Sequence, residues 1–86
     1  MDALMLDGNA VAGLLQEVFG TDVTAATGTC ASCTAVDAVG AVHVYVAAGV
    51  VLRCPHCGSV LMRVVRSDKR LWVDLRGLRS LQLESI

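Results

Sequence analysis

The four cysteines of this chain form two pairs with the same internal spacing, Cys30-Ala-Ser-Cys33 and Cys54-Pro-His-Cys57. Twenty residues separate the pairs, which is within the range typical of a four-cysteine zinc site. Two residues between cysteines let a tight turn direct both sulfurs to one point, and Zn²⁺ prefers four ligands in a tetrahedron. The spacing therefore predicts that these four cysteines hold one structural zinc ion.

The two pairs differ in the residues that shape their turns. Pro55 fixes φ in the second turn, and Gly58 can adopt a positive φ just after its last cysteine. That conformation would point backbone N–H groups at sulfur. Thr34 stands in the equivalent place of the first turn, where a β-branched residue at positive φ is strained. We expect the first turn to be looser or differently bent, with a role for the Thr34 hydroxyl.

Other chemistry for the cysteines is less well supported by the sequence. Iron in a tetrathiolate site needs the same ligands and stays an alternative. A thioredoxin-like redox pair would need a β-α-β frame around one pair, which the pattern lacks. Disulfides are rare in the cytoplasm, and no signal peptide is visible at the N-terminus. A soluble, cytoplasmic metal-binding protein is the prediction.

The same residues argue against an enzyme. A catalytic zinc keeps an open coordination position, whereas four cysteines would fill every position here. The only glutamates available as a general base are Glu17 and Glu84, and no phosphate-binding loop is present. We expect His56 to point away from the metal into solvent, and His43 to be an ordinary strand histidine. We predict no catalytic residue and no small-molecule substrate.

A helix is predicted within residues 1–20. Asp7 or Asn9 can cap its start by accepting a backbone N–H bond, and Gly20 can end it. Between these residues, hydrophobic side chains recur at helical spacing and would form one packing face: Val11, Leu14, Leu15, Val18 and Phe19. Residues 21–29 are small and turn-prone, and we interpret them as a connector.

After the first cysteine pair the pattern alternates with a period of two. His43 and Tyr45 alternate with valines, which is typical of a half-buried strand. Antiparallel strands are predicted over four segments, 42–46, 50–53, 59–66 and 71–76, with turns at 47–49 and 67–70. The fold class is therefore α+β, with the N-terminal helix packed on a small antiparallel sheet of three to five strands.

The motifs "CASCT" and "CPHCGS", one on each side of a predicted β-hairpin, resemble the two knuckles of the zinc-ribbon superfamily. More narrowly, "LDGNA" and "LWVDLRG" resemble a family of short uncharacterised bacterial zinc-ribbon proteins. The length of 86 residues predicts a single domain over residues 1–86. The resemblance places the zinc ribbon at 29–77, and residues 78–86 are interpreted as a tail that forms either a short strand or a helical turn. The resemblance also implies one structural Zn²⁺ on the four cysteines, and no known activity.

Charge divides unevenly along the chain. Residues 1–52 contain five acidic groups and no Lys or Arg, whereas residues 53–86 contain seven basic groups and three acidic ones. Such asymmetry suggests an oriented surface. We name four residues around the 67–70 turn as candidate contacts to nucleic acid or a protein partner: Arg63, Arg66, Lys69 and Arg70. Trp72 is either a stacking platform or a packing residue.

Composition points to a partner. The chain is 55% hydrophobic and only 17% charged, below the quarter or so that is usual for charged residues. The longest apolar run, residues 44–52, is about half the ~20 residues needed to span a bilayer, so we expect no membrane. The leading hypothesis is a non-catalytic protein-interaction module with a protein partner or self-association. The alternative is a nucleic-acid-binding or transcription- or translation-associated zinc ribbon.

Overall fold

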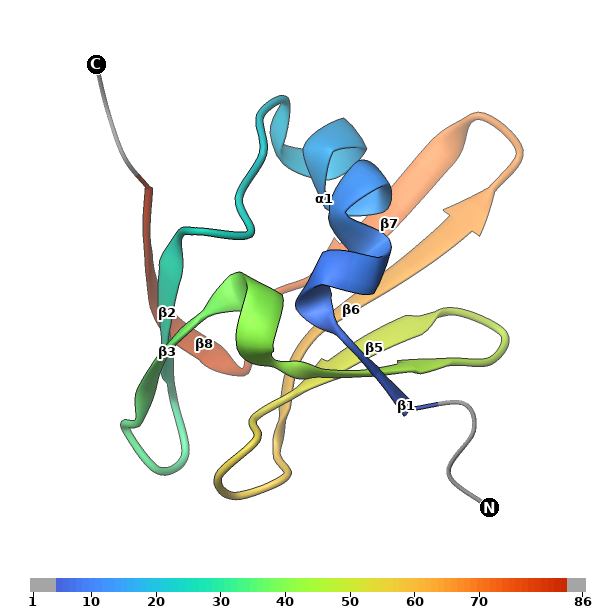
Figure 1. The fold of residues 1–86 in the computed structure, drawn as a ribbon. Helices are drawn as coiled ribbons and strands as arrows, with labels where there is room; N and C mark the ends of the chain where they lie inside the picture. The colour runs from blue at the N-terminus through green and yellow to red at the C-terminus, as the bar shows by residue number, and fades with distance from the viewer. Residues whose placement is uncertain (1–4, 84–86) are drawn as a thin grey trace.

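The computed structural model describes residues 5–83 and shows an α+β fold with two antiparallel sheets (Figure 1). The strand order is β1-β4-β5-β6-β7 in the larger sheet and β3-β2-β8 in the smaller one. In chain order the elements are β1 (Met5–Asp7), the 3-10 helix η1 (Gly8–Val11), α1 (Ala12–Phe19), β2 (Thr27–Cys30), β3 (Val36–Ala38), the 3-10 helix η2 (Val39–Ala41), β4 (His43–Val46), β5 (Val50–Arg53), β6 (Val60–Ser67), β7 (Arg70–Asp74) and β8 (Leu78–Gln82).

The N-terminal helix begins and ends where the sequence predicts. The Asp7 carboxylate accepts a hydrogen bond from the backbone N–H of Ala10 at 3.3 Å and caps η1, which leads directly into α1. Gly20 closes α1 in the left-handed conformation at φ 79°, donating its N–H to the carbonyl of Gln16 at 2.7 Å. The predicted packing face is confirmed, because Leu15 is fully buried and its helical neighbours are partly buried.

This face of α1 packs on one face of the five-stranded sheet, which we call the inner face. An ion pair between Glu17 of α1 and Arg66 of β6 fastens the helix to the strand, with Nη1 and Oε2 3.0 Å apart. Burying these aliphatic side chains stabilises the fold by roughly 1.5–3 kcal/mol for each complete side chain. The largest fully buried side chains are Leu15, Val23, Val44, Leu52, Met62 and Val64.

The three-stranded sheet was not predicted from the sequence. Residues 21–29, interpreted as a connector, contain the buried Val23 and Ala26 and run into β2. Residues 78–86, interpreted as a tail, contain β8, which pairs with β2 from Thr27 to Cys30; residues 84–86 lie outside the described part. These strands are three to five residues long and rich in small or polar residues. An alternating pattern is too short to detect in such segments.

The predicted hairpins of the larger sheet are present. β4 and β5 pair from His43–Arg53 to Val46–Val50, so the turn falls at residues 47–49. β6 and β7 pair up to Ser67 and Arg70, around the polar turn. No helix among residues 5–83 is long and apolar enough to cross a membrane.

Gly77 lies in the short connection between β7 of the larger sheet and β8 of the smaller one. Its carbonyl accepts the backbone N–H of Ala31 at 2.9 Å, in the turn that follows β2. A β-carbon at position 77 would lie 1.7 Å from the carbonyl oxygen of Val60 and 2.6 Å from the Cα of Leu61. Only glycine therefore lets the β7–β8 connection rest on the start of β6.

We predict that Gly77→Ala destabilises the metal-loaded protein by about 2 kcal/mol or more, because backbone rather than a flexible side chain must move. Gly13→Ala is the matched control: a β-carbon there meets nothing within 4 Å, and alanine in a helix should stabilise by roughly 0.5–1 kcal/mol. Urea unfolding of both variants measures the difference. Equal stability of the two would contradict the close packing at Gly77.

Candidate metal centre

The two cysteine pairs lie in two hairpin turns with the same backbone structure. The first knuckle, residues 30–35, joins β2 to β3, and the second knuckle, residues 54–59, joins β5 to β6. In the first, the N–H of Cys30 donates to the carbonyl of Ala35 at 2.9 Å, and that of Thr34 to the carbonyl of Cys30 at 3.0 Å. In the second, the same two bonds recur 24 positions later, both at 2.9 Å. The knuckles therefore belong to different sheets but share one geometry.

Thr34 adopts the left-handed conformation that we expected it to avoid. Its φ is 63°, against 80° for Gly58 at the equivalent position, so the first knuckle is neither looser nor differently bent. Two backbone hydrogen bonds and the cysteine geometry fix this conformation despite its cost of roughly 1–3 kcal/mol for a non-glycine residue. The Thr34 hydroxyl does take part, donating to the carbonyl of Cys33 at 2.5 Å.

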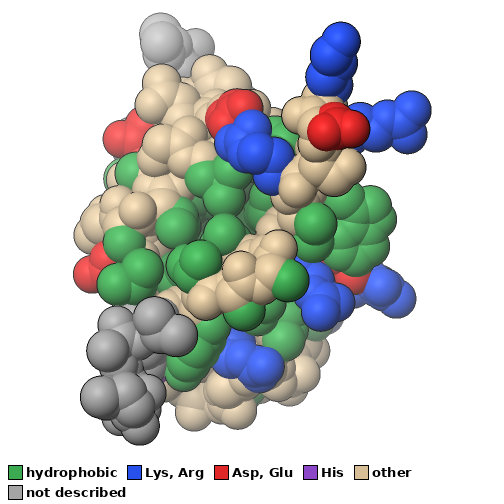
Figure 2. Space-filling model, turned by 90° about the vertical axis from the view of Figure 1, so that its right-hand side faces the viewer, with side chains coloured by type: hydrophobic (Ala, Val, Ile, Leu, Met, Phe, Trp, Pro, Cys, Tyr) green, Lys and Arg blue, Asp and Glu red, His purple; other side chains and the backbone are tan. Residues whose placement is uncertain are grey.

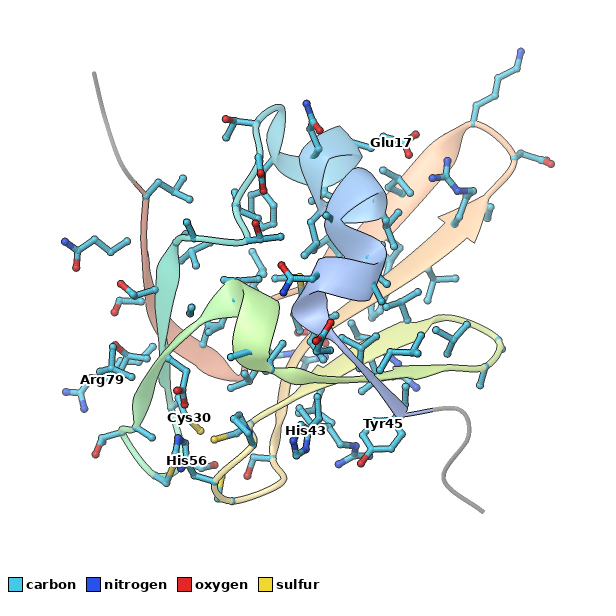
Figure 3. The ribbon with its side chains drawn as sticks, in the orientation of Figure 1. Glu17, Cys30, His43, Tyr45, His56 and Arg79 are labelled. Carbon is cyan, nitrogen blue, oxygen red and sulfur yellow. The ribbon has the colours of Figure 1, made fainter. Side chains whose placement is uncertain are left out.

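The turns bring all four sulfurs to one point. The Sγ atoms lie within 4.8 Å of one another, and two pairs across the knuckles, Cys30–Cys57 and Cys33–Cys54, are each 3.7 Å apart. A tetrahedron with metal–sulfur bonds of about 2.3 Å has edges of about 3.8 Å. Disulfide sulfurs would be about 2.05 Å apart, and all four cysteines are free. The cluster could therefore hold a metal ion. Figure 3 shows the sulfur atoms gathered near Cys30.

Each sulfur also receives a backbone N–H bond from its own knuckle. The N–H of Ser32 donates to Cys30 and that of His56 to Cys54, both at 3.4 Å. Two positions after the other cysteines, the N–H groups of Ala35 and Ser59 donate to Cys33 and Cys57 respectively. Donors aimed at sulfur stabilise thiolates, the form that binds metal.

The pKa values of the two exposed cysteines, Cys33 and Cys57, are shifted in opposite directions. Hydrogen bonds from the hydroxyl and N–H of Ser59 lower the pKa of Cys57 to about 6. At Cys33 the N–H of Ala35 acts in the same direction, but desolvation and the neighbouring sulfurs outweigh it and raise the pKa to about 12. Four thiolates this close repel one another unless a positive ion lies between them.

The four cysteines differ in burial. Cys30 and Cys54 are buried, whereas Cys33 and Cys57 are exposed at the surface. With four sulfur ligands, a tetrahedral ion has no position left for water or substrate. The arrangement fits a metal with a structural task.

A contact between the knuckles was missed from the sequence. His56 was expected to point into solvent, but its Nε2 lies 2.5 Å from Oδ2 of Asp37 in β3. Both side chains are partly exposed, at 56% and 30%. The pair ties the second knuckle to the first hairpin. No spacing rule links these positions, since the contact depends on how the two sheets meet.

Three of the four candidate contact residues, Arg66, Lys69 and Arg70, line one hollow around the β6–β7 turn, together with Glu17 and Asp68. Arg66 lies on the inner face and is paired with Glu17. Arg63 and Arg70 lie on the opposite face of the sheet, at different ends of the β6–β7 hairpin, and Lys69 lies in the turn between these strands. Trp72 is 51% exposed, so it is not a core residue.

Comparisons with known proteins identify one family. Its model matches residues 2–85, and it is described as a family of unknown function, DUF6510. No curated protein and no solved structure matches the chain.

We predict that the strain in the first knuckle can be relieved. Thr34→Gly should raise the stability of the metal-loaded protein by about 1 kcal/mol, because glycine adopts positive φ without steric cost. The matched change Gly58→Thr should lower stability by about 1–2 kcal/mol. Thermal unfolding of both variants with saturating metal measures this. Destabilisation by Thr34→Gly would mean that the hydroxyl bond outweighs the strain.

We predict that metal binding at pH 7 releases protons, including the one that Cys33 holds because its pKa is about 12. Below pH 6 the affinity should fall more steeply, since Cys57 is then also protonated and must release its proton on binding. Ser59→Ala removes a donor to that thiolate and should move the steep region to higher pH. Titration calorimetry in buffers of different ionisation enthalpy counts the protons; binding without proton release would contradict this account.

Proposed function

Because the chain belongs to the DUF6510 family, for which no function is known, we propose its function from its own geometry. We infer that it is a small zinc-ribbon protein in which one structural Zn²⁺ is held by Cys30, Cys33, Cys54 and Cys57. The zinc-supported fold then acts as a non-catalytic binding module. The observation that carries this proposal is the convergence of four sulfurs from two matching turns to within 4.8 Å.

A structural role is supported by where the knuckles come from. Each turn belongs to a different sheet, so an ion between them cross-links the two halves of the fold. A domain of this size buries a small core and often needs such a link. Metal–thiolate binding can contribute on the order of 10 kcal/mol of apparent folding free energy, which is as large as the whole stability of a typical domain.

A binding role is supported by the surface that the fold leaves open. α1 covers the inner face of the five-stranded sheet, while Tyr45 and Trp72 on the opposite face are 38% and 51% exposed. We propose that this exposed face binds a partner, which includes the protein partner or self-association that the composition predicts. A catalytic role has no support from the metal, whose four positions would all be taken by cysteine.

We predict one zinc ion per chain in protein produced without added iron, measured by elemental analysis. Removing it with a strong chelator should abolish the cooperative thermal transition, because the two sheets lose their link. Cys57→Ser should bind zinc much more weakly. Ser32→Ala, which changes an exposed residue of the first knuckle, is the control and should bind zinc as the unchanged protein does. A red, iron-loaded protein would exclude zinc, and an unchanged transition after metal removal would exclude the structural role.

A further inference from the structure

The face of the five-stranded sheet opposite α1, which we call the outer face, is assembled from four strands. Residues directly opposite each other in antiparallel strands point to the same side, and the register places Tyr45, Val51, Arg63 and Asp74 in one row across β4, β5, β6 and β7. In the next row Val65 lies opposite Trp72. The outer face thus combines two aromatic rings with arginine.

The two rings are separated, so each is available to a ligand. Three strand spacings of about 4.8 Å put β4 and β7 about 14 Å apart, and the rings of Tyr45 and Trp72 cannot stack on each other across that distance. The guanidinium group of Arg53 lies 5.7 Å from the centre of the Tyr45 ring. Its Nη1 donates to the carbonyl of Gly58 at 2.8 Å. Tyr45 and Arg53 therefore form one preformed cation–π unit.

The outer face is also positively charged. A hollow of about 320 Å³ lies between β5, β6 and the β7–β8 connection, and three of its lining residues are arginines, Arg53, Arg63 and Arg76. Its one carboxylate, Asp74, forms an ion pair with Arg76 at 2.7 Å. Arg70 lies directly opposite Ser67 and on the same side of β7 as Trp72. The outer face therefore carries four arginines and one aspartate.

The remaining charges reinforce this polarity. The chain as a whole has a net charge of −1, and residues 1–52 contain no Lys or Arg. Glu17 and Arg66 neutralise each other on the helix side, and Asp7, at the edge of the sheet, is turned to cap η1. Figure 2 shows hydrophobic side chains over the centre of this side view, with Lys and Arg side chains toward its top, right and lower edges and Asp and Glu beside several of them. A polyanion would therefore be attracted to one face in particular.

We propose that the outer face binds single-stranded nucleic acid, with phosphates at the arginines of the hollow and bases stacked on Trp72 and on the Tyr45–Arg53 unit. Separated aromatic rings beside a basic groove are what unpaired bases and their phosphates require. Bases in a duplex are already stacked and cannot use the rings. Tyr, Trp and Arg also occur at protein interfaces, so the nucleic-acid ligand is inferred from the separation of the two rings beside the arginine-lined hollow. This inference rests on the proposed binding module and names its ligand.

The chain supplies its own probe, because Trp72 is its single tryptophan. Zinc-loaded protein is titrated with unlabelled oligothymidylate and oligouridylate of about 12 nucleotides, a length typical of one such surface. We expect quenching of Trp72 fluorescence by both, with affinity falling as salt rises from about 50 to 200 mM. A duplex of the same length should bind weakly and leave the fluorescence unchanged. A preference between the DNA and RNA strands identifies the natural class.

Variants test which surface binds, using anisotropy of labelled oligonucleotide. Trp72→Ala should weaken binding about 5- to 100-fold, as expected for loss of one stacked base, and Arg63→Gln should weaken it and reduce the salt slope by about 0.7. Arg79→Gln, an equal loss of charge on β8 of the other sheet, and Val36→Ala, an exposed residue on β3, are the matched controls and should change affinity less than twofold.

Two results would overturn the inference. One is the absence of quenching and of salt-sensitive binding at low salt, which would leave a protein as the occupant of this face. The other is equal loss of affinity in Arg63→Gln and Arg79→Gln, which would show non-specific attraction. Metal analysis is done on the same samples: zinc-free protein that still binds would refute only the structural zinc, and zinc-loaded protein that does not bind would refute only the nucleic-acid ligand.

Discussion

The four sulfurs are the point on which the rest of this structure depends. They come from two hairpin turns in two different sheets, and they lie at the separation that a tetrahedral ion requires. Without a cation, the same sulfurs would hold their protons or repel one another, as the high pKa of Cys33 indicates. The larger sheet has its hydrophobic core under α1. The smaller one is short, and its contacts to the larger sheet include the Gly77 hydrogen bond and the His56–Asp37 pair close to the cysteine cluster.

The division of the sheet into two faces follows from this arrangement. α1 and its connections cover the inner face with aliphatic side chains, and the second sheet is attached at the metal end rather than on the outer face. Strand alternation then puts aromatic and basic residues on the uncovered side. The proposed function uses this division: the metal maintains the frame, and the exposed sheet face contacts a ligand.

The sequence was sufficient for the parts of the structure that have a strong local signal. Cysteine spacing predicted the cluster, the period of the apolar residues predicted α1 with its cap and its glycine end, and alternation predicted the β4–β5 and β6–β7 hairpins. Strands β2, β3 and β8 were not clearly predicted from the sequence, because short segments of small residues are ordered by their neighbours rather than by local preference. Thr34 was misjudged for a related reason: propensity rules out positive φ for threonine, but the hydrogen bonds of the knuckle override that preference.

Arg53 connects the second knuckle to the outer face of the five-stranded sheet. Its guanidinium group is bonded to the carbonyl of Gly58, within the second knuckle, and lies over the Tyr45 ring on the outer face. One side chain thus bridges the ligand-holding turn and an exposed aromatic ring. The position of the Arg53 group beside Tyr45 therefore depends on the geometry of the second knuckle, while Trp72, on the far edge strand, is held mainly by its own hairpin. A change in the geometry of the second knuckle would therefore reach the Tyr45 end of the outer face through Arg53, without a matching contact to the Trp72 end.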